Sequence, residues 1–151
     1  MKSKNLLQIA IEDRDLIKKL IPHREPMIMV DGLHHYSEKE AIASLTVRED
    51  NLFIADGMFS ESGLIEHMAQ TAALHAGYKF YTKNESAREG FIASIKKFEL
   101  KEHLPKLNNT IESEVNILYE AAGMTSMRII AQINNRIIAI AEMTTVLKDN
   151  H

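Results

Sequence analysis

SESGLIEHMAQTAALHAGYKFYTK, residues 60–83, is the one segment that is long, apolar and free enough of helix breakers to form a helix passing through a core. Ser60 or Ser62 can cap its start, and Lys79 and Lys83 lie near its end, where the helix dipole favours cations. The pattern therefore predicts one long central helix. Its apolar residues recur at helical spacing and are Leu64, Ile65, Met68, Ala69, Ala72, Ala73, Ala76 and Phe80.

One carboxylate interrupts this apolar helix. Glu66 lies a turn inside its start, and an acid buried without a purpose is costly, so its presence is the first indication of a chemical role. Gln70 follows one turn later, where it is placed either to hold that carboxylate or to form an ordinary polar pair. His67, Thr71 and His75 share another side of the helix, which we expect to be partly exposed.

The segments on either side of the helix predict a sheet. Residues 3–20 suggest a short amphipathic helix that breaks near Asp13, and Pro22 and Pro26 end it. The wholly apolar run Met27–Val30 predicts a first strand that is buried on both faces. Further strands are predicted at residues 40–48, 91–100, 110–119, 124–133 and 136–147.

Local details add to this prediction. Asn134-Asn135 indicates a tight hairpin, because Asn tolerates a positive φ better than most residues, and Asp56-Gly57 is a good turn. Gly63 and Gly77 allow another backbone to approach the helix closely. Tyr119 is expected on the same face as the other apolar residues of its strand.

The order of elements is a helix, two strands, one long helix and four strands, which predicts a single α+β domain over residues 1–151. We expect a curved, mostly antiparallel sheet with one face on the central helix. A single helix cannot cover six strands, and the sheet edges stay exposed. Dimerisation through strand edges is therefore expected.

The composition narrows the functional classes. The chain has 151 residues, 45% of them hydrophobic and 26% charged, and its net charge of -3 does not favour nucleic-acid binding. It has no cysteine, which excludes disulfides, thiolate metal sites and a cysteine nucleophile. No apolar run reaches the roughly 18 residues that span a bilayer, and no signal-peptide cleavage site follows the N-terminal lysines. We therefore expect a cytoplasmic protein without a membrane partner.

Two stretches carry a resemblance to a known family. Leu20–Asp31, LIPHREPMIMVD, resembles the L-P-H-R-x-P-(apolar)4-D opening of the hotdog-fold 3-hydroxyacyl-acyl-carrier-protein dehydratases. Leu64–Ala72, LIEHMAQTA, is similar to the (apolar)2-E-x-(apolar)-A-Q pattern of that family's central helix. The order of elements also agrees, so the resemblance covers essentially the whole chain and implies a hotdog fold.

The resemblance implies a homodimeric double hotdog with one continuous sheet and an acyl tunnel at the subunit interface. It also implies a catalytic acid on the helix, which carries over to Glu66, and a histidine of the partner subunit in a G-H-F-P motif. That motif falls on Asn51–Ile54, where Phe53 matches but Leu52 stands in place of the histidine. The departures thus cluster in the catalytic loop, while the scaffold motifs are kept.

Other residues are therefore candidates for the base that this histidine would have supplied. His23 in the matched Pro-His-Arg motif is the best candidate, with a structural role as the alternative. Asp56 lies in the loop that replaces the catalytic one, where a turn is the simpler interpretation. Amides near Gly63 at the helix start are placed to polarise a thioester carbonyl. The predicted substrate-binding residues are Gly63, Leu52, Phe53 and Gln70.

The resemblance implies a 3-hydroxyacyl-ACP dehydratase-like lyase that acts on or binds acyl thioesters of a carrier protein or CoA, in fatty-acid, polyketide or polyene biosynthesis. Two alternatives stay open. One is a thioesterase in which Glu66 or Asp56 activates water. The other is a catalytically incomplete partner subunit of another hotdog dehydratase. The sequence offers no phosphate-binding loop, metal cluster or dinucleotide fingerprint, so no cofactor or metal is expected.

Overall fold

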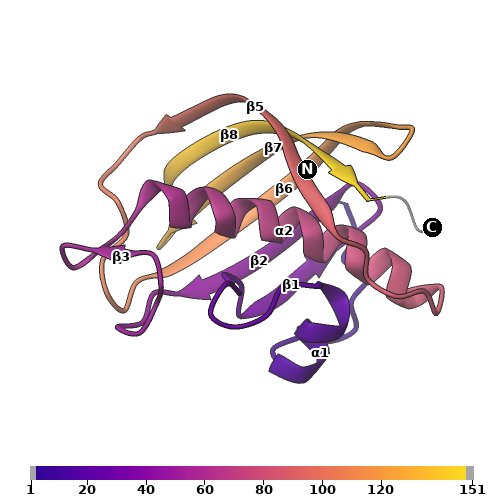
Figure 1. The fold of residues 1–151 in the computed structure, drawn as a ribbon, viewed down its shortest axis with the longest axis horizontal. Coiled ribbons are helices and arrows are strands. Elements are labelled where there is room, and N and C mark those ends of the chain that lie inside the picture. Colours follow the sequence, from indigo (N-terminus) through magenta and orange to yellow (C-terminus); the bar gives the residue numbers. More distant parts are fainter. Residues whose placement is uncertain (1–2, 149–151) are drawn as a thin grey trace.

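The computed structural model describes residues 3–148 and is built around one long helix. This helix, α2, runs from Glu61 to Thr82, as residues 60–83 predicted. Ser60 is its N-cap and accepts a hydrogen bond from the Gly63 amide at 3.1 Å, and Lys83 is its C-cap. Figure 1 shows α2 lying across the concave side of a curved sheet.

The sheet has six strands in the order β1-β2-β6-β7-β8-β5, and every neighbouring pair is antiparallel. Positive φ angles at Ala122-Gly123 and at Asn134-Asn135 make tight turns at two consecutive hairpins, the second as predicted. The predicted α+β hotdog architecture is confirmed. The strands are β1 (Gly32–Tyr36), β2 (Glu40–Thr46), β5 (Gly90–Leu100), β6 (Thr110–Ala121), β7 (Met124–Ile133) and β8 (Arg136–Leu147).

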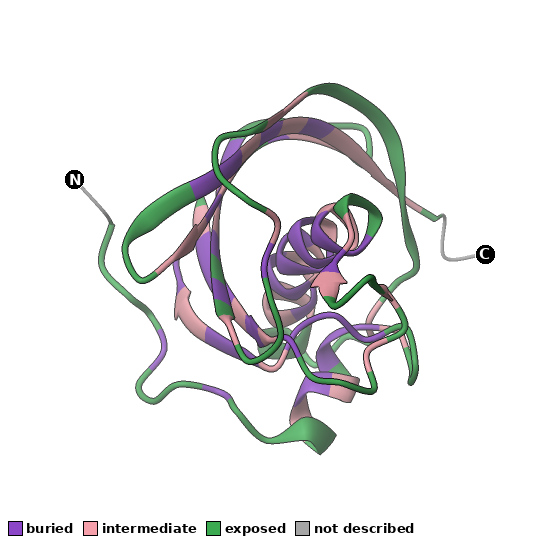
Figure 2. Cartoon of the chain, turned by 90° about the vertical axis from the view of Figure 1, so that its left-hand side faces the viewer, coloured by how far each residue is buried: buried purple, intermediate pink, exposed green. Residues whose placement is uncertain are grey.

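The core lies between α2 and the concave face of the sheet. Figure 2 shows the sheet arched around the mostly buried α2. A second helix, α1 (Arg14–Leu20), packs against α2 at Gly77, where an added Cβ would lie 1.7 Å from the carbonyl oxygen of Leu20. The close backbone approach predicted at Gly77 is thus confirmed, because no residue with a side chain fits there.

Two predictions near the N-terminus are wrong. Met27–Val30 is not a strand; it is an irregular segment, and the first strand is instead Gly32–Tyr36. Side chains of α2, described below, hydrogen-bond this segment in place of a neighbouring strand. Residues 3–12 are not helical, and the helix begins only after Asp13, whose side chain caps α1 at the predicted break.

Two further details differ along the chain. The entry loop to α2 contains a small hairpin, β3 (Ile54–Ala55) and β4 (Met58–Phe59), closed by the predicted turn at Asp56-Gly57 with φ angles of 53° and 75°. Tyr119 is 66% exposed, because a β-bulge between Ile117 and Tyr119 shifts the alternation of β6. Strict alternation therefore misplaced this side chain.

Strand β5 is an edge strand with unusual exposure. Within residues 3–148 it pairs with β8 alone, and most of its residues are exposed, among them Phe91, Ile92 and Ile95 at 57%, 38% and 41%. Such an edge offers unpaired backbone groups and apolar side chains to another chain. Within residues 3–148, no helix combines the length and the apolar character needed to cross a membrane.

Candidate active site

A cavity of about 920 Å³ runs along α2. Its walls are α2 from Glu66 to Phe80 with the C-cap Lys83, residues of the segment 20–27, the start of β5 and the hairpin between β6 and β7. The helix contributes a row of small side chains, and their small volume leaves the space open. This volume suits a small-molecule ligand or an acyl chain. The row consists of Ala69, Ala72, Ala73 and Ala76.

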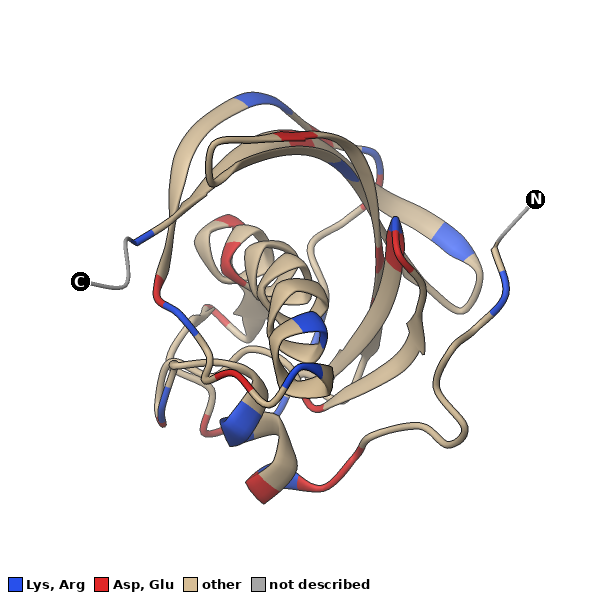
Figure 3. Ribbon diagram, turned by 90° about the vertical axis from the view of Figure 1, so that its right-hand side faces the viewer, with Lys and Arg blue, Asp and Glu red and all other residues tan. Residues whose placement is uncertain are grey.

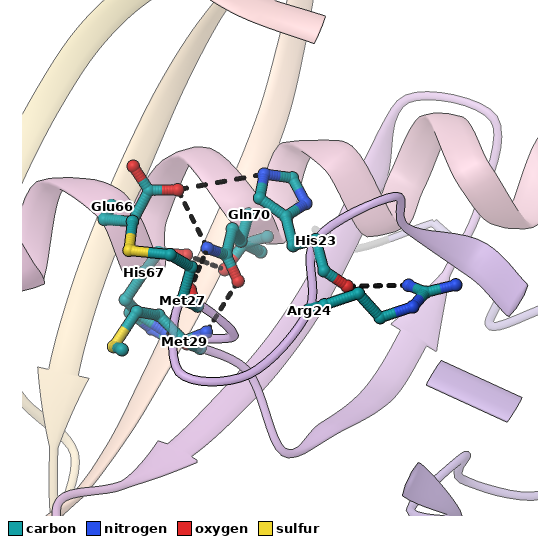
Figure 4. Close-up of polar contacts among 8 residues, drawn as sticks. His23, Arg24, Met27, Met29, Glu66, His67 and Gln70 are labelled. Carbon is teal, nitrogen blue, oxygen red and sulfur yellow. Dashed lines mark hydrogen bonds and ion pairs between the residues drawn. The ribbon is translucent and has the colours of Figure 1, made fainter. Parts of the chain in front are cut away.

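Two titratable side chains meet at one end of this cavity. His23 Nε2 lies 3.8 Å from Glu66 Oε2, and the two side chains are 24% and 25% exposed (Figure 4). His23 comes from the turn after α1 and Glu66 from the second turn of α2, so residues 43 positions apart converge here. The sequence singled out both residues but gave no reason to place them together.

The surroundings of His23 favour its neutral form. Burial lowers the pKa of its imidazole, the nearby Glu66 carboxylate raises that pKa, and Arg24 lowers it; the net change is downward. His23 Nδ1 is buried and has no hydrogen-bond partner among residues 3–148. A neutral imidazole facing an apolar cavity is able to accept a proton, and the carboxylate beside it stabilises the cation that results.

Gln70 fixes this end of the cavity. It is fully buried and donates hydrogen bonds to Glu66 Oε2 at 2.8 Å and to the Met27 carbonyl at 2.7 Å. Its own oxygen accepts the Met29 amide at 2.6 Å. Gln70 therefore orients the Glu66 carboxylate and holds the segment after His23 against the helix (Figure 4).

His67 lies on a neighbouring side of the helix and is fully buried, so the expectation of a partly exposed face is wrong. Its Nδ1 is 2.8 Å from the Met29 carbonyl and its Nε2 is 2.9 Å from Ser113 Oγ. Burial lowers its pKa to about 4, which leaves it neutral at pH 7. The same side also buries Thr71 and His75, because β2 and β6 pack against it.

The remaining predicted site residues do not line this cavity of the single chain. Asp56 is exposed at the tip of the β3–β4 hairpin, and Leu52 is 53% exposed. Phe53 packs against the core, and an added Cβ at Gly63 would lie 2.5 Å from it. The Gly63 amide donates to Ser60 Oγ and so caps the helix in this structure.

The other end of the cavity was not predicted from the sequence. There the walls are the last turns of α2, the start of β5 and the turn Ala121–Gly123. Five residues line the cavity here without having been predicted to do so: Phe80, Lys83, Arg88, Glu120 and Met124. The only signal available was the apolar and cationic composition of residues 79–92, and it does not say which hairpin lies opposite.

Comparison with known proteins identifies the family of this chain. The sequence profile of the ApeP-like family, described as ApeP dehydratase, matches residues 16–151. The chain belongs to the ApeP-like dehydratase family. This ApeP-like protein is also 29% identical over 141 residues to the 3-hydroxyacyl-[acyl-carrier-protein] dehydratase FabZ of Pseudothermotoga lettingae, covering 90% of this chain and 96% of that enzyme. The FabZ of Oceanobacillus iheyensis is 25% identical over 142 residues, covering 90% and 99%.

Solved structures share the fold of the ApeP-like protein. A chain of the dehydratase heterocomplex ApeI:P from Xenorhabdus doucetiae superposes with a TM-score of 0.83 at 16% identity, over 89% of this chain and 91% of that chain. A hypothetical thioesterase with coenzyme A from Streptococcus pneumoniae superposes with a TM-score of 0.59 at 10% identity, over 77% and 84%. At these identities the likeness concerns the fold alone. The family resemblance drawn from the sequence is confirmed.

Proposed function

We propose that this protein is a 3-hydroxyacyl thioester dehydratase whose reacting groups are His23 and Glu66. The observation that carries the proposal is their approach to 3.8 Å at one end of an apolar cavity. The family match and the FabZ relatives support the reaction class. The thioester lies beside the pair, and one arm of the substrate, either its acyl chain or its pantetheine arm, lies along the alanine row of α2.

The chemistry follows from the states of the two side chains. Neutral His23 accepts the proton from C2 of the substrate, and the C–H electrons become an enolate conjugated to the thioester carbonyl. The enolate then forms the C2=C3 double bond and expels the C3 hydroxyl, which takes the proton from the His23 imidazolium and leaves as water. The Glu66 carboxylate stabilises that imidazolium, and the hydrogen bond from Gln70 keeps the carboxylate in place.

The exposed β5 edge supports assembly with a second hotdog chain. Pairing through β5 would extend the sheet and cover Phe91, Ile92 and Ile95. Under this proposal the assembly is a homodimer or a complex with another hotdog subunit. Acyl carrier protein or CoA delivers the substrate, and the cytoplasmic location expected from the sequence stays a prediction.

A direct assay tests the proposal. The purified protein is incubated with 3-hydroxyacyl and 2-enoyl thioesters of an acyl carrier protein, and their interconversion is followed by mass spectrometry. His23→Gln and Glu66→Gln should each reduce turnover by about 100-fold or more, since positioned acid–base groups contribute roughly 10²–10⁴. His103→Gln and Glu61→Gln are matched controls, because both side chains are exposed outside this cavity and should leave turnover unchanged.

Acidification gives a second readout. Because burial lowers the pKa of His23, the imidazole stays neutral at pH 7 and turnover falls only when the pH drops below about 6.5, the ordinary histidine value. Full turnover in His23→Gln with unchanged pH dependence would overturn the assignment of the base.

One observation favours the partner-subunit alternative. Leu52 stands where the FabZ-like motif has its histidine, so a second chain with an intact motif would supply a base that this chain lacks. In that case the isolated protein binds the thioester without turnover, and interconversion appears only with an added hotdog dehydratase and survives His23→Gln. Release of free thiol from the same substrates would instead indicate the thioesterase alternative.

A further inference from the structure

The two ends of the cavity differ in their charged side chains. Its Glu66 end holds the reacting pair, whereas its other end is lined by Lys79, Lys83 and Arg88. Along α2, Lys83 lies about 25 Å from Glu66, from the helical rise of roughly 1.5 Å per residue. Figure 3 shows Lys and Arg segments at and beyond the C-terminal end of α2, under the arch of the sheet.

Two of these cations are not neutralised. Lys79 lies 4.0 Å from the Glu120 carboxylate, which also lines the cavity. Neither Lys83 nor Arg88 forms an ion pair with any residue in the range 3–148. Glu85, the acid between them in sequence, does not line the cavity. The cavity end therefore keeps a net positive charge.

Arg88 is also held in position. Its guanidinium carbon lies 5.1 Å from the centre of the Phe80 ring, and both residues line the cavity. A cation–π contact of this kind fixes the guanidinium without neutralising it, so its N–H groups stay available to an anion. A planar guanidinium next to an ammonium group is well suited to carboxylate or phosphate.

We propose that Lys83 and Arg88 form an anion subsite for the thioester substrate. It binds a carboxylate or phosphate group that the substrate carries about 20–25 Å from the carbon beside Glu66. This inference rests on the proposed function for the choice of the reacting end. Two parts of a substrate are able to carry the anion: the phosphate of a phosphopantetheine arm, or an anionic group at the end of the acyl chain.

The test combines four synthetic 3-hydroxyacyl thioesters. Two are N-acetylcysteamine thioesters and two are phosphopantetheine thioesters, and in each pair the acyl chain ends in a methyl group or in a carboxylate. Binding is measured by calorimetry, which works without turnover. The variant is Lys83→Gln/Arg88→Gln, and the matched control is Lys39→Gln/Lys96→Gln, which removes two exposed charges outside the cavity.

The double cavity variant should raise the Kd about tenfold for the anion-bearing ligands, since each partly exposed charge contact changes affinity roughly threefold. The neutral N-acetylcysteamine thioester should bind equally to all proteins. Loss confined to the phosphopantetheine compounds assigns the phosphate, and loss confined to the carboxylate-ended compounds assigns the acyl end. Raising the salt concentration should weaken binding in the wild type and the control, but not in the cavity variant.

Equal binding of all four ligands by the wild type and the cavity variant would overturn the subsite. Dehydratase turnover is measured separately. Its absence would count against the proposed function, whereas the anion subsite is judged by the difference in Kd alone. Circular dichroism and thermal unfolding confirm that the variants are folded before binding is compared.

Discussion

Replacing Gln70 with Leu tests the link between the central helix and the reacting pair. The change keeps a side chain of similar size in a fully buried position but removes three hydrogen bonds. The Met29 amide then has no acceptor, and the Met27 carbonyl loses its donor. A buried group left without a partner costs about 1–3 kcal/mol, so we expect the free energy of unfolding to fall by about 2–4 kcal/mol.

Urea denaturation followed by circular dichroism measures this change. Gln132→Leu is the matched control, because Gln132 is half-buried in β7 and its side chain makes no hydrogen bond within residues 3–148. That control should alter stability by less than about 0.5 kcal/mol. A loss below about 1 kcal/mol for Gln70→Leu would refute the inference that Gln70 holds Met27 and Met29 in place.

Three further predictions concern stability. Gly77→Ala should destabilise the fold by about 3 kcal/mol or more, since its Cβ would lie 1.7 Å from the Leu20 carbonyl; an unchanged melting temperature would contradict that packing. Ser60→Ala should cost about 1 kcal/mol in urea denaturation through loss of the cap on the Gly63 amide, and Ser60→Asp should restore most of it. Burial lowers the pKa of His67 to about 4 in the folded state, whereas the unfolded imidazole titrates near 6.5. Its contribution to the free energy of unfolding is therefore complete above pH 6.5 and falls by about 3 kcal/mol on acidification to pH 4, because only the unfolded state binds the proton in most of this range. His67→Gln should remove this part of the pH dependence, and an identical slope in the variant would contradict it.

The fold was largely predictable because its elements carry local signals. The apolar spacing of residues 60–83 and the serine cap at residue 60 predicted α2, and Asn134-Asn135 predicted a turn that the structure shows with positive φ angles. The irregular segment Met27–Val30 was not predictable, because its hydrogen-bond partners are Gln70 and His67, about 40 positions further along the chain. A segment whose backbone is hydrogen-bonded by distant side chains can have the same apolar composition as a buried strand, so composition alone does not distinguish the two.

The candidate site was predictable in part. Glu66 was identified from its position in an apolar helix, and His23 from a sequence motif. Their approach to 3.8 Å depends on α1 packing against α2, a tertiary contact that has no local signature. The burial of His67 was missed for a related reason: helical spacing groups side chains on a face, but it does not tell which faces of a central helix are covered by other elements.

The open edge of β5 has a consequence for how the protein is made. Nine of its 11 residues pair with β8, and within residues 3–148 no strand pairs with its other side, which presents backbone amides and carbonyls next to Phe91 and Ile95. Each newly synthesised chain thus offers a template on which a further strand can add. A chain made without a strand partner for this edge should therefore aggregate more readily than the Ile95→Lys variant, which a sedimentation assay of the cell lysate would measure.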